Sequence, residues 1–217
     1  MNCNTIKLSP QSLIVHLDAL KKKCRYMAYA LDAVGVSSPR QREEGFKTLL
    51  KIVIDQQISV QAGAAIWDRI EKRLGVVSAE RTLAVSPKTL QKCGLSKQKT
   101  AYTLELARAV QAGKLDFKGL NNLDDQTVVT QLTRIKGIGI WTAEIYLMFA
   151  MGRPDILPAG DLALQIASQS LLGLKEKPQP KELRQISERW APHRTSAALI
   201  LWKFYRTPSC MINIERK

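Results

Sequence analysis

The 217-residue sequence predicts an all-α fold. Along nearly the whole chain, apolar residues recur three and four positions apart, which is the spacing of one face of a helix. We find no convincing run of alternating apolar and polar residues, the pattern of a half-buried strand. Ser-Pro pairs at 38–39 and 86–87 and glycines at 75, 94, 113 and 152 interrupt the periodic segments, as helix boundaries usually do. Ordinary helix and connection lengths then predict roughly eight to ten helices.

Each expected helix follows from a stripe of residues on one face. In chain order, four such stripes are Phe46, Leu49, Leu50, Val53 and Gln57; Ala62, Ile66, Ile70 and Leu74; Tyr102, Leu106, Ala109 and Val110; and Ala198, Leu201, Trp202 and Tyr205. Residues 124–135 form another expected helix with Asp124 or Asp125 as its N-cap. The next helix begins near Ile140, and a further one follows Asp161, where Ala163, Ile166, Ala167 and Leu171 share a face.

The charge of the chain points to an anionic partner. Lys and Arg number 33 and Asp and Glu 19, which gives a formal net charge of +14. Such an excess usually accompanies binding to nucleic acid or to an anionic membrane, and nucleic acid is the partner we favour. A soluble protein with a generally basic surface is the alternative.

Several other classes of protein fit the sequence poorly. No stretch is long and apolar enough for a membrane span, and Arg153 and Pro154 end the longest candidate. The N-terminal residues lack the basic-then-apolar order of a signal peptide. The four cysteines are scattered without a CxxC pair, and the two histidines are His16 and His193, which argues against a metal site, an iron–sulfur cluster or a disulfide framework. We expect a cytoplasmic protein without a cofactor, associated with the nucleoid if it is bacterial.

Residues 136–139 read Lys-Gly-Ile-Gly between two expected helices. Gly137 and Gly139 permit positive φ and leave the backbone amides uncovered. Amides at the start of the following helix bind phosphate oxygens, and Lys136 adds positive charge. This pattern is typical of a helix-hairpin-helix, which binds the DNA backbone without reading its sequence. An ordinary turn between helices, with glycines as C-caps, is the alternative.

Asp161, Trp141 and Trp202 are the side chains with the most chemical interest. An Asp before a helix is most often an N-cap, and this role is compatible with a catalytic one because a capping carboxylate is held rigidly. Trp141 shares a stripe with Ile145, Met148 and Phe149, so core packing is its simplest explanation, as it is for Trp202. If they faced a ligand, the two indole rings could stack on a base or lie against a cationic one.

Together these residues resemble a known family. The segment IKGIGIWTA, followed twenty residues after Trp141 by Asp161 in LPAGD, is similar to the helix-hairpin-helix–Gly/Pro–Asp DNA glycosylase superfamily. Within it, the resemblance is to the DNA-3-methyladenine glycosylase II type, in a short form without the N-terminal β domain. The segments at 52–70, 93–107 and 189–206 agree, so the resemblance covers about residues 42 to 206.

The resemblance implies a role for each matching position. Asp161 becomes the catalytic aspartate, Trp141, Trp202 and Ile145 line the base pocket, and Gly137 and Gly139 form the phosphate-binding hairpin. Gln57 and Ile58 become the wedge that fills the gap left by a flipped nucleotide, and Ser96 and Lys99 lie near the DNA backbone. Main-chain carbonyls of Thr133, Ile135 and Ile138 would hold a monovalent cation, and no metal is expected to be essential.

The sequence also departs from the family in ways that matter. Bifunctional members carry a Schiff-base lysine where this chain has Trp141, so no imine and no strand cleavage are expected. Gln57 stands where the long enzymes have a leucine wedge, which leaves the identity of the wedge open. Ile145 replaces a pocket aromatic, so the range of substrates could differ.

The resemblance implies two helical subdomains with a DNA-binding cleft between them. One is expected to span 45–152 and end in the helix-hairpin-helix; the other combines 1–44 with 153–217 and carries Asp161. The implied function is a monofunctional, monomeric DNA glycosylase that flips alkylated purines such as 3-methyladenine and 7-methylguanine out of double-stranded DNA. A non-catalytic helix-hairpin-helix DNA-binding protein and a glycosylase for oxidised or mispaired bases are the alternatives.

Overall fold

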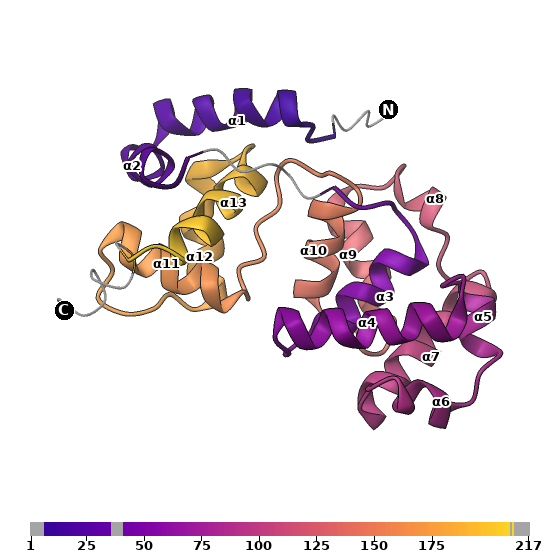
Figure 1. Cartoon of the computed structure of the whole chain (residues 1–217). Coiled ribbons are helices and arrows are strands. Elements are labelled where there is room, and N and C mark those ends of the chain that lie inside the picture. The colour runs from indigo at the N-terminus through magenta and orange to yellow at the C-terminus, as the bar shows by residue number, and fades with distance from the viewer. Residues whose placement is uncertain (1–6, 36–40, 209, 211–217) are drawn as a thin grey trace. The chain divides into compact units, whose positions relative to one another are not determined.

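The computed structural model describes residues 7–35, 41–208 and 210, and the regular elements in these ranges are helices (Figure 1). The prediction of an all-α fold is confirmed. These ranges hold thirteen α-helices and a short 3₁₀ helix, more than expected. Part of the difference comes from α5 (Ala79–Leu83), α6 (Pro87–Lys92) and α8 (Phe117–Leu120), which are too short for a helical period to be recognised in the sequence.

The chain divides into two compact units. Unit 1 contains residues 42–146, and unit 2 contains the described residues between 7 and 41 together with 147–208 and 210. The limits expected from the sequence are 45 and 152, whereas the later boundary in the structure lies inside α10 (Ile140–Phe149). The segment after Tyr146 is fastened to unit 2, because Leu8 donates its N–H to the carbonyl of Gly152 at 2.7 Å.

In unit 1, α3 (Phe46–Asp55) is the central helix, with Leu49, Leu50 and Val53 all buried. It packs against α4 (Val60–Leu74) and α7 (Lys97–Gln111). The expected stripe that ends at Gln57 is too long, because α3 ends at Asp55 and Gln57 is exposed.

The stripe expected on α4 is wrong at its first residue. Ala62 is exposed and its neighbour Gly63 is buried. A Cβ at Gly63 would overlap the side-chain carboxylate of Asp55, so a larger residue there requires that carboxylate to move. The pair α9 (Asp125–Thr133) and α10 follows with Asp124 as the N-cap of α9, as expected.

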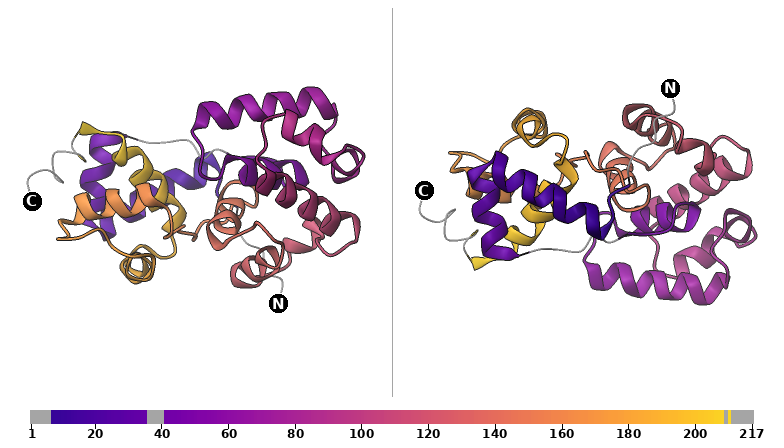
Figure 2. Two further views of the ribbon diagram at one scale, coloured as in Figure 1. Left: turned by 90° about the horizontal axis from the view of Figure 1, so that it is seen from below. Right: turned by 90° about the horizontal axis from the view of Figure 1, so that it is seen from above.

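Unit 2 brings helices from both ends of the chain together. It comprises α1 (Pro10–Lys23), α2 (Arg25–Val34), α11 (Leu162–Leu172), α12 (Pro180–Ser187), the 3₁₀ helix η1 (Glu188–Trp190) and α13 (Arg194–Tyr205). Helix α13 is central, because it packs against α1, α2 and α11 and buries its residues from Thr195 to Leu201 (Figure 1). Figure 2 shows the N-terminal helices next to α13 from two further directions.

No helix in the described part of the chain is long and apolar enough to cross a membrane. The same residues hold no group of three or more His, Cys, Asp and Glu side chains arranged to bind a metal ion.

Candidate functional site

Asp161 is the N-cap of α11, as the sequence predicts. Its Oδ1 accepts hydrogen bonds from the backbone N–H of Ala163 at 3.0 Å and of Leu164 at 3.2 Å. The same oxygen accepts a third bond, from the indole N–H of Trp202 on α13, at 3.1 Å. Three donors from two helices therefore fix the orientation of this half-buried carboxylate.

The loop that leads to Asp161 is held from within unit 2. Residues 156–159 are buried, and Asp161 donates its own N–H to the carbonyl of Pro158 at 2.8 Å. The buried side chain of Gln165 donates to the carbonyl of Ala159 at 2.9 Å, and Lys177 donates to the Gln165 side-chain oxygen at 2.7 Å. The carboxylate thus lies on a supported turn, and no sequence pattern indicates the support from Gln165.

Trp202 has a second contact besides its hydrogen bond to Asp161. Its ring stacks on that of Phe149, with centroids 5.9 Å apart and planes inclined by 27°. The family resemblance predicts that Trp202 lines a base pocket, and this stays a prediction. The structure adds that its N–H orients the carboxylate. Phe149, which the sequence assigns only to a core stripe, belongs to the same cluster.

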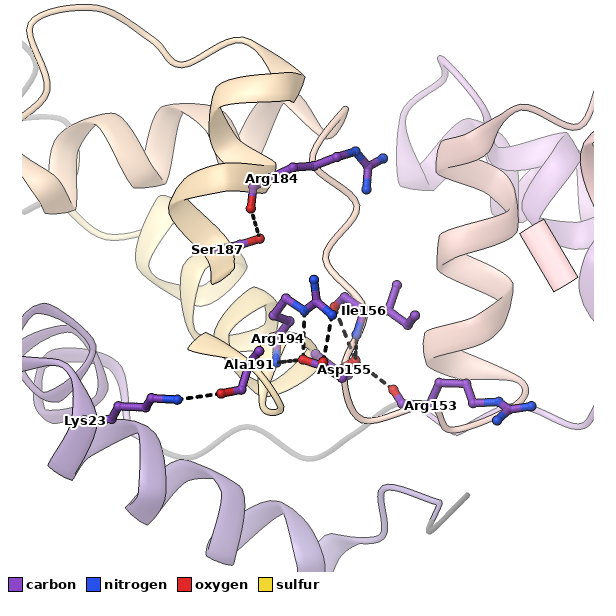
Figure 3. Close-up of polar contacts among 9 residues, drawn as sticks. Lys23, Arg153, Asp155, Ile156, Arg184, Ser187, Ala191 and Arg194 are labelled. Atoms are coloured by element: carbon purple, nitrogen blue, oxygen red, sulfur yellow. Dashed lines mark hydrogen bonds and ion pairs between the residues drawn. The ribbon is translucent and has the colours of Figure 1, made fainter. Parts of the chain in front are cut away.

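The helix that carries Trp202 is anchored at its N-terminus by Asp155 (Figure 3). Asp155 accepts the backbone N–H of Arg194 at 3.1 Å and two guanidinium bonds from the same residue, at 2.8 and 2.7 Å. Burial acts to raise the pKa of Asp155, but the hydrogen bonds and charge of Arg194 outweigh it and lower that pKa. Thr195 adds a bond from its hydroxyl to the carbonyl of Arg153 at 2.7 Å.

Trp141 and Ile145 lie on α10 in unit 1. Trp141 is half-buried, whereas Ile145 is buried. Their assignment to a base pocket stays a prediction.

The turn between α9 and α10 carries the two glycines of the expected hairpin, and its binding of phosphate stays a prediction. Gly137 has a φ of +95°, and a Cβ there would overlap the ring of Tyr102, so only glycine fits. A Cβ at the exposed Gly139 would meet no atom within 4 Å, which leaves the backbone open to a ligand. The first amides of α10 follow directly, and Lys136 is exposed beside them.

The carbonyls proposed to hold a cation, those of Thr133, Ile135 and Ile138, belong to this same stretch of chain. The carbonyl of Ile135 accepts the N–H of Ile138 at 3.0 Å, and its second lone pair is compatible with an ion. The cation site stays a prediction.

The turn after α3 carries Gln57 and Ile58, whose role as a wedge stays a prediction. Gln57 is exposed and Ile58 is half-buried, and both come before α4, whose N-cap is Ser59. Sequence reasoning did not single out the preceding residue, Gln56, as functional. Its side chain donates to the carbonyl of Gly137 at 3.1 Å and to the hydroxyl of Thr142 at 2.7 Å. The signal for it was the pair of successive glutamines before α4: the Gln56 side chain binds the hairpin, whereas Gln57 is exposed.

Ser96 and Lys99 are both at the start of α7. Ser96 is exposed and is the N-cap, accepting the backbone N–H of Lys99 at 3.1 Å. The ammonium of Lys99 donates to the carbonyls of Ile54 at 2.5 Å and Gln56 at 2.6 Å. Burial lowers the pKa of Lys99, and the charge of Asp55 opposes this effect. Lys99 therefore makes its strongest observed contacts inside unit 1.

Comparisons with known proteins find a matching family and similar structures. Residues 50–193 match the sequence profile of the HhH-GPD superfamily base excision DNA repair proteins. A putative DNA-3-methyladenine glycosylase of Bacillus subtilis is 28% identical over 73% of this chain, and the chain spans 58% of the length of that relative.

Two solved structures are also similar. A 3-methyladenine DNA glycosylase of Schizosaccharomyces pombe, in complex with abasic DNA, superposes with a TM-score of 0.82 at 27% identity, covering 89% of this chain and 98% of that one. A DNA-3-methyladenine glycosidase of Bacillus halodurans gives a TM-score of 0.78 at 32% identity, covering 95% and 92%.

Proposed function

Because this chain belongs to the HhH-GPD superfamily of base excision DNA repair proteins, we propose that it is a monofunctional DNA glycosylase for alkylated purines. Its substrates are 3-methyladenine, 7-methylguanine or similar bases in double-stranded DNA, and it acts as a monomer. The relatives named above, which are 3-methyladenine glycosylases by name, support this substrate class.

The observation that carries the proposal is the fixed carboxylate of Asp161. Three N–H groups orient one of its oxygens, on a loop that buried residues support. A carboxylate that only caps a helix needs the two backbone bonds but not the bond from Trp202. The additional donor, on a helix 41 residues away in sequence, suggests that the orientation of the carboxylate matters to the function.

Unit 1 supplies the proposed contacts to DNA. The first amides of α10 and Lys136 bind backbone phosphates, which needs no base sequence. The turn at Gln57 and Ile58 occupies the space that a flipped nucleotide leaves in the duplex. Rotating the nucleotide out of the stack costs a few kcal/mol, which these contacts offset.

In the proposed reaction the protein contributes mainly electrostatic stabilisation. An alkylated purine such as 3-methyladenine carries a positive charge and is already a good leaving group, so a general acid is not required. As the glycosidic bond breaks, the sugar becomes similar to an oxocarbenium ion. The carboxylate of Asp161 stabilises this cation and orients the water that attacks C1′.

The proposed reaction ends at the abasic site. Cleavage of the strand by β-elimination proceeds through an imine to an amine nucleophile. The position that holds a lysine in the bifunctional members is Trp141 here, whose indole nitrogen cannot form an imine.

The test is base release from defined duplexes. The protein is incubated with DNA that carries 3-methyladenine, 7-methylguanine, 1,N6-ethenoadenine or hypoxanthine, and free base is measured together with strand breaks before and after alkali. We expect free base from the two methylated purines and strand breaks only after alkali. Breaks without alkali would contradict the monofunctional mechanism, and tight DNA binding without base release would favour the non-catalytic alternative.

A further inference from the structure

The turn that follows α3 has an unusual backbone conformation. Among the described residues other than glycine, only Gln57 has a positive φ, at +54°. This region is unfavourable for side chains other than Gly, Asn and Asp, and such residues persist where their surroundings enforce the conformation. The contacts that enforce it come from both sides of the turn.

On one side is Lys99, which reaches from the first turn of α7. Its ammonium binds the carbonyls of Ile54 and Gln56, at 2.5 and 2.6 Å. These carbonyls end α3, where the backbone has no further helical N–H donors and carries the negative end of the helix dipole. A charged donor to both is the strong form of this contact.

On the other side is the hairpin. The side chain of Gln56 donates to the carbonyl of Gly137 and to the hydroxyl of Thr142, which belong to the turn and to the first residues of α10. Tyr102, one turn after Lys99 on α7, packs so closely against Gly137 that no side chain fits there. The turn at Gln57, the hairpin and the start of α7 are therefore joined in one network inside unit 1.

We propose that Lys99 and Gln56 are positioning residues that hold the Gln57 turn at a fixed distance from the phosphate-binding hairpin. This inference rests on the proposed function. Insertion of Gln57 into a duplex pushes the turn back towards α3, and the two residues resist that displacement. Binding of a phosphate and separation of the stacked bases then occur on one rigid element. Lys99 acts through the turn and does not itself bind a phosphate.

The test compares Lys99→Met, which keeps the aliphatic stem, with Lys97→Met. Lys97 is an exposed lysine on the same helical turn, so it controls for the loss of one positive charge near the same surface. Gln56→Met is a second variant that removes the hairpin bonds without touching any charge. Thermal unfolding identifies any variant that does not fold. If either Lys99→Met or Gln56→Met does not fold, the other variant tests the positioning role.

The first readout is amide hydrogen exchange of the DNA-free protein. We expect residues 56–59 to exchange at least about tenfold faster in Lys99→Met and Gln56→Met, because each loses two hydrogen bonds, and to be unchanged in Lys97→Met. The second readout is the salt dependence of binding to an undamaged duplex. The slope should be the same for Lys99→Met as for the wild type, because no phosphate contact is lost.

The third readout is catalysis. Base release by Lys99→Met should lose at least about tenfold in kcat, with a smaller change in KM, because the wedge no longer holds the flipped state. A salt slope reduced by about one in Lys99→Met, with unchanged exchange at 56–59, would identify Lys99 as a phosphate ligand and overturn the proposal. If the wild type releases no base, the proposed function fails, while exchange and salt slope still decide the positioning role.

Discussion

Replacing Asp161 with asparagine removes the negative charge of the proposed catalytic group and keeps its size. The asparagine oxygen can still accept the N–H groups of Ala163, Leu164 and Trp202, so the helix cap is retained. The variant therefore separates the charge of this side chain from its structural role.

The size of the expected effect follows from the charge. A unit charge about 4 Å from a developing cation contributes about 4 kcal/mol at an effective dielectric constant of about 20. Each 1.36 kcal/mol changes a rate about tenfold, so kcat for base release should fall by about a thousandfold. The stability loss should stay near 1–2 kcal/mol, because neutral acceptors bind more weakly and a favourable helix-dipole term is lost. That corresponds to a fall in Tm of less than about 8 °C.

The assay is single-turnover release of 7-methylguanine, with Tm and affinity for an abasic-site duplex measured on the same preparations. Asp124→Asn is the matched control, because Asp124 also caps a helix and accepts the N–H of Thr127 at 2.9 Å. The control should keep full activity. A loss of less than about tenfold in well-folded Asp161→Asn would refute the catalytic assignment.

Three further predictions concern other parts of the molecule. Gly137→Ala should lower the free energy of unfolding by at least about 2 kcal/mol in denaturant titrations, because at this positive φ the new Cβ overlaps the ring of Tyr102. Gly139→Ala should remain stable and lose affinity for DNA. Equal stability of the two variants would contradict the hairpin geometry. Trp202→Phe should lower kcat about tenfold or more while KM changes little, because the Asp161 carboxylate loses the indole N–H donor. A change confined to KM would show that Trp202 serves only the base pocket. Burial is the main cause of the lowered pKa values of His16 and His193, whose rings lie edge to face. The folded state therefore favours the neutral imidazoles, and Tm should fall as the pH drops from about 6.5. His16→Gln should weaken this pH dependence of Tm, and an unchanged pH profile of Tm in the variant would exclude the histidine pair as its cause.

Much of the fold could be predicted from the sequence because helices are local. Asp124 and Asp161 cap their helices through bonds to residues two or three positions away, and the start of α10 near Ile140 follows from the glycines before it. The errors occurred where a local pattern met a packing constraint. Gln57 continues an apolar spacing but lies beyond the end of α3, and the buried residue at the start of α4 is Gly63, next to the Asp55 side chain, in place of Ala62.

The sequence by itself determined the helices, their caps, the glycine turn and the motif spacing that leads to the family. Only the tertiary structure decided what holds the candidate groups in place. Trp202 donates to a carboxylate 41 residues away, and Lys99 donates to carbonyls 45 and 43 residues away. Helical periodicity reports which face of each helix is apolar, but it carries no information about which polar atoms on different helices come within hydrogen-bonding distance.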